Sequence, residues 1–270
     1  MDDIDSSAAN NSESKAHYSI YGISFGNCVK IVTRFKSSVR KERNMLSPRL
    51  GFLQRCDKIP KQMREEGKMM QIVLATSNKG KVREIKAMCE DFDVVAFSEV
   101  IEPFEIVEDA PTFKGNALLK AKAVYDALDD EEAIVLSDDS GISVDALDGA
   151  PGIFSARYAG ENANDKENLY KLMDEVRAKG LKSASAHYTA AIAIVTKEGE
   201  QVVHGWMYGD VITEPRGENG FGYDPCFIPE GFEKTLGELD DDVKKELSHR
   251  SKALYLAKLV LSTIKKGRAL

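Results

Sequence analysis

The stretch QIVLATSNKGKVREIKAMCEDF, residues 71–92, contains the first complete strand, turn and helix that the sequence predicts. The apolar run IVLA predicts a short buried strand, and TSNKGK after it predicts a tight polar turn. Beyond the turn, Val82, Ile85 and Cys89 recur at helical spacing and predict an amphipathic helix. A strand that leads through a turn into a helix is typical of α/β proteins.

The elements expected after this unit alternate at first and then include a pair of long strands. The pair is separated only by KEGE, residues 197–200, which predicts an antiparallel hairpin. We therefore predict an α/β fold with a mixed, elongated β-sheet flanked by helices. In chain order, the further elements are a strand over 93–97, a helix over 112–128 capped by Thr112, a strand over 133–136, a helix ending at Gly180, strands over 183–196 and 200–212, and a helix over 248–266.

Charge is distributed unevenly along the 270 residues. Residues 1–70 carry 13 Lys and Arg against 8 Asp and Glu, whereas residues 71–270 carry 24 against 36. We therefore expect a basic N-terminal extension over residues 1–70, disordered or accessory, and a folded domain over residues 71–270. The extension is either an arm that binds nucleic acid, a membrane surface or a partner, or an accessory stretch without a role in catalysis; we favour the second.

The composition argues against several classes of protein. No apolar run reaches the ~18 residues that a membrane span needs. The formal net charge of −7 disfavours nucleic-acid binding by the body of the protein. The four cysteines lie far apart and without metal-site spacing, so we expect no disulfide, no zinc and a cytoplasmic location; they are Cys28, Cys56, Cys89 and Cys226.

Two adjacent carboxylates, Asp138 and Asp139, follow the apolar run AIVL. Asp, Ser and Gly are ordinary turn residues, so the segment DDSG can simply end a strand. However, charges beside a buried strand lose hydration unless a partner such as a divalent cation compensates them. Ligands of open α/β sheets bind at the carboxyl ends of strands, and this position favours a site.

Three further segments offer groups suited to a phosphorylated ligand. TSNKGK lies at a predicted helix start and lacks the spacing of a P-loop; on its own it is either a phosphate site or a simple capped helix start with Lys81 in solvent. Glu108 precedes the helix over 112–128, where acids either stabilise the helix dipole or bind Mg²⁺ together with Asp139. The aromatics of GFGYDP can stack on a ring, and His249 and Arg250 supply fixed donors.

In combination these motifs resemble the inosine triphosphate pyrophosphatase family, which hydrolyses non-standard purine nucleoside triphosphates to monophosphate and pyrophosphate. The resemblance runs from about Gln71 to the end and includes TSNKGKVREI, DDSGISVDALDGAPGIFSARYAG, GFGYDPCFIP and SHRSKAL in the family's order. It implies two lobes with a central cleft, a homodimer, and a purine nucleoside triphosphate such as ITP, dITP or XTP as substrate. It also implies one Mg²⁺ per subunit, for which Mn²⁺ can substitute.

The resemblance also implies residue roles. Asp139 resembles the general base and a metal ligand, Glu108 the second metal ligand, and Asp138 a supporting group. Ser77 stands where the family often has glycine. Implied substrate contacts are Thr76, Ser77, Asn78, Lys79, Gly80, Lys81, Ser140, Phe221, Gly222, Tyr223, Asp224, Lys244, His249 and Arg250.

The expected mechanism is attack of a water, deprotonated by Asp139, on the α-phosphorus, with Lys81 and Mg²⁺ neutralising the triphosphate. Because neighbouring side chains of a strand point to opposite faces, we expect a turn at Ser140–Gly141 to bring the two aspartates together. Donors from His249 and Arg250 favour a 6-oxo purine over adenine. Two alternatives remain: a pyrophosphatase of the same fold for pyrimidine or modified nucleotides, and a non-catalytic nucleotide-binding module.

Overall fold

The computed structural model describes residues 69–268, so the prediction of a disordered or accessory extension lies, except for its last two residues, outside the described part. The strands are β1 (Gln71–Leu74), β2 (Asp93–Ala96), β3 (Val135–Val144), β4 (Ser183–Thr196), β5 (Gly199–Ile212) and β6 (Phe227–Pro229). The helices are α1 (Lys79–Met88), α2 (Phe113–Leu128), α3 (Asp165–Ala178), α4 (Asp241–Leu247) and α5 (His249–Arg268). Short 3₁₀ turns lie at Phe97–Glu99, Asp145–Leu147, Gly152–Arg157, Asp224–Cys226 and Leu236–Glu238.

The six strands form one mixed sheet in the order β2-β1-β3-β4-β5-β6. β1 pairs in parallel with both β2 and β3, whereas β3 to β6 pair antiparallel. The predicted hairpin forms as β4 and β5, which pair along their whole length from Ser183↔Ile212 to Thr196↔Gly199. The prediction of an α/β fold with a mixed sheet is thus confirmed.

Local signals set where the first two helices begin. The Asn78 side chain caps α1 by accepting hydrogen bonds from the backbone N–H of Gly80 at 2.9 Å and of Lys81 at 3.1 Å. Thr112 caps α2 as expected, because its hydroxyl accepts a hydrogen bond from Gly115 N at 3.0 Å. These caps place the start of α1 directly beyond the carboxyl end of β1.

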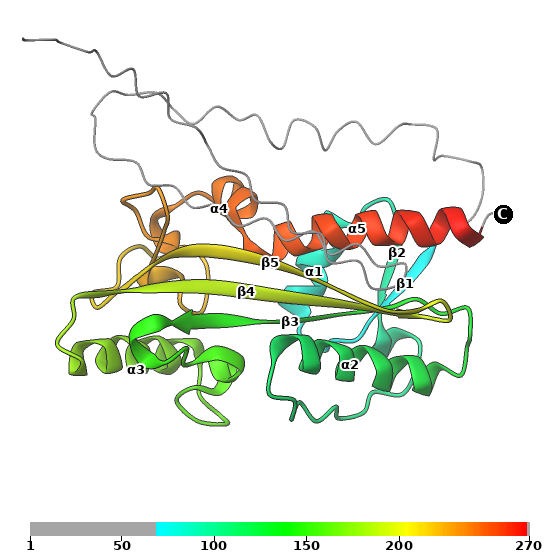
Figure 1. The fold of residues 1–270 in the computed structure, drawn as a ribbon, viewed down its shortest axis with the longest axis horizontal. Coiled ribbons are helices and arrows are strands. Elements are labelled where there is room, and N and C mark those ends of the chain that lie inside the picture. The colour runs from blue at the N-terminus through cyan, green and yellow to red at the C-terminus, as the bar shows by residue number, and fades with distance from the viewer. Residues whose placement is uncertain (1–68, 269–270) are drawn as a thin grey trace, which may run out of the picture. The chain divides into compact units, whose positions relative to one another are not determined.

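Helices cover the two faces of the sheet, and Figure 1 shows α5 and α2 on opposite sides of the long strands. Leu74, Leu136 and Ile192 pack with α1 and α5 on one face. Val73, Val135 and Ala193 pack with α2 on the other face. None of the helices within residues 69–268 is long and apolar enough to cross a membrane.

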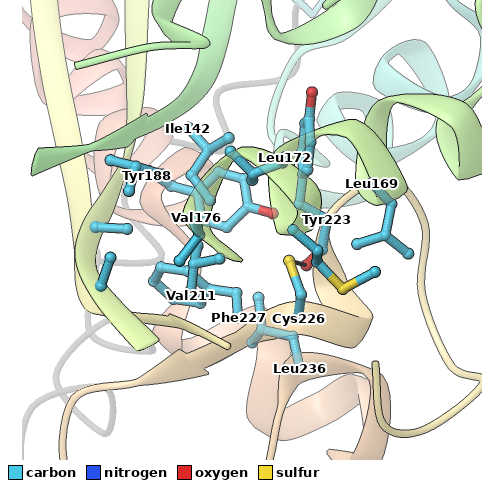
Figure 2. Packing of buried hydrophobic residues seen from close by; sticks show 14 of the residues in the cluster. Ile142, Leu169, Leu172, Val176, Tyr188, Val211, Tyr223, Cys226, Phe227 and Leu236 are labelled. Carbon is cyan, nitrogen blue, oxygen red and sulfur yellow. Dashed lines mark hydrogen bonds between the residues drawn. The ribbon is translucent and has the colours of Figure 1, made fainter. Parts of the chain in front are cut away.

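A third core cluster lies at the far end of the long strands (Figure 2). There the apolar face of α3, including Leu172 and Val176, packs against Ile142 and against Phe227 of β6. Tyr223 belongs to the same cluster, so the GFGYDP segment is anchored in the core.

The prediction of a turn at Ser140–Gly141 is wrong. β3 continues to Val144 and pairs with β4 at every position from Val135↔Val195 to Val144↔Ala186. Glycine at 141 serves a close approach rather than a turn: a Cβ there would lie 2.4 Å from Ser155 Oγ. Because β4 supplies hydrogen-bond partners to β3 beyond the two aspartates, the strand continues through them. Asp138 and Asp139 therefore lie on opposite faces of the sheet.

Candidate active site

The site forms where β3 extends beyond the end of its neighbour β1. The two strands pair only at Val73↔Val135 and Leu74↔Leu136, so β3 from Asp138 onward lacks a strand on this side within the described residues, apart from a single bridge between Ser143 and Pro151. α1 begins just beyond β1, and its Lys81 reaches Asp138. From Gly141 on, this edge is covered by the segment 150–155, so a ligand can approach β3 near residues 138–140, at the carboxyl end of β1.

On one face of β3, Asp138 is held by cations. Its Oδ2 lies 2.8 Å from Lys81 Nζ and 3.4 Å from Arg250 Nε, and it accepts a hydrogen bond from Ser140 Oγ at 3.2 Å. Burial raises the pKa of Asp138, but the charges of Arg250 and Lys81 outweigh burial and hold this pKa well below its usual range. Arg250 in turn donates to Ser140 Oγ at 2.9 Å and to Glu84 Oε2 at 2.6 Å.

On the other face, Asp139 and Glu108 share one lysine. Lys120 Nζ donates to Glu108 Oε2 at 2.7 Å and to Asp139 Oδ1 at 3.2 Å. Burial raises the pKa of Asp139 above its ordinary value, although the charges of Lys120 and Lys81 oppose this rise. Burial lowers the pKa of Lys120, but the charges of Asp139 and Glu108 outweigh it, so the lysine is a cation. The structure thus brings Glu108 and Asp139 together, as the sequence predicted.

Sequence reasoning missed Lys120 and Glu84. Lys120 lies on the buried stripe of α2 with Ala117, Ala121 and Val124, and only 7% of it is exposed. A lysine on an otherwise apolar stripe is a signal that could have been read, because buried lysines need a charged partner. For Glu84 no comparable signal exists, since its partner Arg250 lies 166 residues away.

The residues present fit a divalent cation such as Mg²⁺. Asp139 Oδ2 is buried and accepts no hydrogen bond, so it has lone pairs free beside Glu108. Within residues 69–268 no group of three or more His, Cys, Asp or Glu side chains is placed to hold a metal. Mg²⁺ needs only one or two carboxylates when water and phosphate oxygens complete its shell, and this pair meets that need.

Several polar groups of the turn Thr76–Lys81 form hydrogen bonds within the turn itself. Asn78 Oδ1 already accepts from Gly80 N and Lys81 N, and Thr76 Oγ1 accepts from Asn78 N at 3.2 Å. Two amides expected to meet phosphate are therefore used within α1. Ser77 and Lys79 are exposed, and the Lys81 ammonium is the group of this turn that reaches the edge of β3.

His249 begins α5 and is partly buried, with its ring stacked. Its ring lies on that of Tyr188, with centroids 4.8 Å apart and planes 14° from parallel. Burial and the charge of Arg250 lower the pKa of His249 to about 3, so the imidazole is neutral. Its Nδ1 is buried without a hydrogen-bond partner.

The segment containing residues 221–224 presents one aromatic and buries the other. Phe221 is 69% exposed, whereas the Tyr223 hydroxyl donates to Ser155 O at 2.7 Å. Asp224 Oδ2 accepts from Phe221 N at 3.3 Å, and burial raises the pKa of Asp224 to about 6. The structure therefore leaves Phe221 free to stack on a ring and uses Tyr223 to tie the segment to the loop beside Gly141.

Gly222 and Lys244 complete the predicted set. Gly222 N donates to Asp165 Oδ2 at the start of α3, at 3.1 Å. Lys244 Nζ pairs with Asp241 at 2.8 Å, and its charge acts on Asp224. Lys244 thus lowers the pKa of Asp224 through its charge, although the two residues are twenty positions apart in sequence.

Comparison with known proteins decides the family. The sequence profile described as the Ham1 family matches residues 72–259. The chain belongs to the Ham1 family. Among its relatives, proteins named dITP/XTP pyrophosphatase from Sulfurimonas denitrificans and a Sulfurovum species are 65% and 62% identical; the matches cover 72% and 73% of this chain, and 100% and 95% of theirs.

Solved structures of Ham1 proteins agree with this membership. The Staphylococcus aureus Ham1 protein is 37% identical with a TM-score of 0.65, and the match covers 72% of this chain and 98% of that one. A HAM1 protein from Coxiella burnetii is 35% identical with a TM-score of 0.65, covering 72% and 100%. The family expected from the sequence motifs is confirmed.

Proposed function

We propose that this Ham1 protein is a nucleoside triphosphate pyrophosphatase that hydrolyses dITP, XTP and ITP to the monophosphate and pyrophosphate. The observation that carries the proposal is the buried, unpartnered Oδ2 of Asp139, whose other oxygen is held by Lys120 beside Glu108. The names of the relatives, which match along nearly their whole length, support the substrate class. The reaction removes non-standard purine nucleotides from the nucleotide pool.

Asp139 is the general base. Its pKa is raised by burial, which makes the ionised carboxylate a better proton acceptor. It takes a proton from a water that attacks the α-phosphorus, the bond from that phosphorus to the bridging oxygen breaks, and pyrophosphate leaves. Lys120 fixes the orientation of the carboxylate through Oδ1 and leaves Oδ2 for the water or the metal.

Lysine side chains of the protein neutralise part of the negative charge of the triphosphate. Lys81 lies at the edge of β3 on the side of the α1 turn, and Lys120 lies on the Asp139 side. A divalent cation held by Glu108 and Asp139, with Mg²⁺ expected and Mn²⁺ as a substitute, supplies further charge neutralisation when bound. Asp138 orients Lys81 and Arg250, which both contact its Oδ2.

Selection of the purine base rests on N–H donors of Arg250 that are held in place by hydrogen bonds to other side chains. Arg250 is 5% exposed and is held by Asp138, Ser140 and Glu84, so its remaining N–H groups point in a fixed direction. These donors, with the neutral His249, favour the 6-oxo group of hypoxanthine or xanthine over the amine of adenine. A homodimer and a cytoplasmic location stay predictions.

The test is release of pyrophosphate from ITP, XTP, dITP, ATP, GTP, CTP and dTTP with Mg²⁺, measured for the wild type and for Asp139→Asn. We expect fast release from ITP, XTP and dITP, and a loss of about 10²-fold or more in the variant because the general base is removed. Preferential turnover of CTP or dTTP would favour the pyrimidine alternative. Release of orthophosphate, or activity that survives the substitution, would refute the mechanism.

A further inference from the structure

The segment that carries Glu108 has no regular secondary structure of its own. Residues 102–112 lie between the 3₁₀ turn Phe97–Glu99 and α2, and they form neither a helix nor a strand. The Glu108 carboxylate is one of the two proposed metal ligands, and it accepts a hydrogen bond from Lys120 Nζ at 2.7 Å. Because a ligand on an irregular segment is only as well placed as its backbone, contacts from outside the segment must fix that backbone.

The first turn of α2 fixes this backbone through Asn116. The Asn116 side chain is buried, and its Oδ1 accepts a hydrogen bond from Ala110 N, two residues after Glu108, at 2.9 Å. Gly115 permits the close approach, since a Cβ there would lie 2.6 Å from Ala110 Cβ. The segment is thereby held against α2 at Ala110.

Asn116 and Lys120 hold the Glu108 segment from one side of the same helix. They are four residues apart, so they lie one turn apart on one face of α2. Asn116 fixes the backbone near Glu108, whereas Lys120 binds the Glu108 carboxylate and also Asp139 Oδ1, the latter at 3.2 Å. The two carboxylates come from different segments, and α2 therefore sets their relative position.

The helix α3 contains the same arrangement at a place without a proposed metal ligand. Asn168 is the fourth residue of α3, as Asn116 is of α2, and it is also buried. Its Oδ1 accepts from Ala159 N at 2.7 Å, and its Nδ2 donates to Ala156 O at 3.1 Å. Asn168 thus provides a matched comparison for a purely structural effect of a buried asparagine.

We propose that Asn116 is a positioning residue for the divalent cation: by holding Ala110 it keeps Glu108 beside Asp139, where both carboxylates can bind one ion. The inference rests on the proposed function, because the cation is part of that proposal. Loss of a partner that orients a metal ligand without touching the metal typically lowers metal affinity by about 10- to 100-fold.

The test is direct binding of Mn²⁺ to the full chain, measured from the electron paramagnetic resonance signal of free Mn²⁺. The α,β-imido analogue of dITP is present at less than the protein concentration, so the measurement needs no turnover. We expect Asn116→Ala to weaken Mn²⁺ binding about tenfold. Asn116→Asp keeps an oxygen that can accept from Ala110 N, whether or not the carboxyl group is ionised, and should recover part of the affinity.

Asn168→Ala is the control for a loss of stability. Denaturant titration should show that both alanine variants are less stable than the wild type, because each loses hydrogen bonding by a buried side chain. The Mn²⁺ affinity of Asn168→Ala should nevertheless equal that of the wild type.

Glu108→Gln separates failure of this inference from failure of the proposed function. If Glu108→Gln weakens Mn²⁺ binding and Asn116→Ala does not, Asn116 does not position the metal ligand. Equal weakening in Asn168→Ala and Asn116→Ala would overturn the inference as well. If Glu108→Gln binds Mn²⁺ as tightly as the wild type, the metal site itself is refuted, and with it both the inference and the part of the metal in the proposed function.

Discussion

At the scale of single residues, Asp138 and Asp139 show how the surroundings shift the pKa of one residue type in opposite directions. Burial raises the pKa of each, but Asp138 meets Arg250 and Lys81 at close range, and its pKa falls far below normal. Asp139 meets Lys120 at 3.2 Å and Glu108 nearby, and its pKa rises. A carboxylate with a low pKa is a fixed anion that orients cations, whereas one with a raised pKa can accept a proton.

Lys120→Met tests whether the lysine that bridges Glu108 and Asp139 controls the pKa of Asp139. Loss of the ammonium leaves Asp139 buried near Glu108 without its main compensating charge, so the pKa of Asp139 rises further. Since the base must be ionised, activity falls as pH drops through that pKa, and the acid limb of the kcat/KM profile should move to higher pH. We also expect kcat to fall by about 10²-fold, measured with dITP.

The matched control for this change is Lys122→Met. Lys122 lies two residues further along α2 and pairs with Glu200 at 2.6 Å on the surface. Its loss should change neither kcat nor the acid limb. An acid limb at the same pH in Lys120→Met and wild type would show that Lys120 does not act on the base.

At the scale of elements, the contact of α5 with β5 positions the residues that we propose select the nucleobase. α5 begins with His249 and Arg250, and it crosses β5 at Gly205. A Cβ at Gly205 would lie 2.1 Å from His249 O and 2.6 Å from Ala253 N, so only glycine permits this approach. The start of α5 is therefore set by Gly205, a residue outside the proposed set of substrate contacts.

Gly205→Ala should push the first turn of α5 away from the sheet. We expect the free energy of unfolding to fall by about 1–3 kcal/mol, as for other overpacked sites, measured by denaturant titration. KM for dITP should rise because Arg250 loses its position relative to Asp138.

Gly267→Ala is the control within the same helix. A Cβ there meets nothing within 4 Å, so the substitution should leave KM unchanged and stability unchanged or slightly higher. Equal KM values for Gly205→Ala and wild type would mean that the packing of α5 does not set the substrate site.

At the scale of the whole molecule, the groups assigned to catalysis lie within residues 76–250, and the Ham1 relatives match only about three quarters of the chain. The body is acidic, whereas residues 1–70 carry 13 Lys and Arg against 8 Asp and Glu. The residues assigned to catalysis and the excess of basic residues therefore lie in different parts of the sequence. The reaction should not depend on the basic part.

Deletion of residues 1–68 tests this separation. We expect kcat/KM for dITP to stay within about twofold of the full chain, because every side chain assigned above is retained. Any binding of nucleic acid, measured by fluorescence anisotropy, should disappear with the deletion. A collapse of turnover would place the functional boundary before residue 69.

The sequence by itself determined the fold class and the family, and it indicated the segments from which the proposed site is built. Periodicity predicted α1, α2, α3, α5 and the long hairpin, because the period of each element is recorded in neighbouring residues, but it did not predict the short α4 and β6. Motifs such as TSNKGK and SHRSKAL identified the family, and Glu108 was correctly expected near Asp139.

Only the tertiary structure decided how these groups are arranged. The strand continues past Asp139 because β4, some fifty residues later, supplies its hydrogen bonds; this overturned the expected turn. The pairing of Lys120 with Asp139 and of Glu84 with Arg250 likewise joins separate elements. Hydrogen bonds and charge pairs between distant segments leave little pattern in the local sequence, so the protonation and orientation of the site follow from packing.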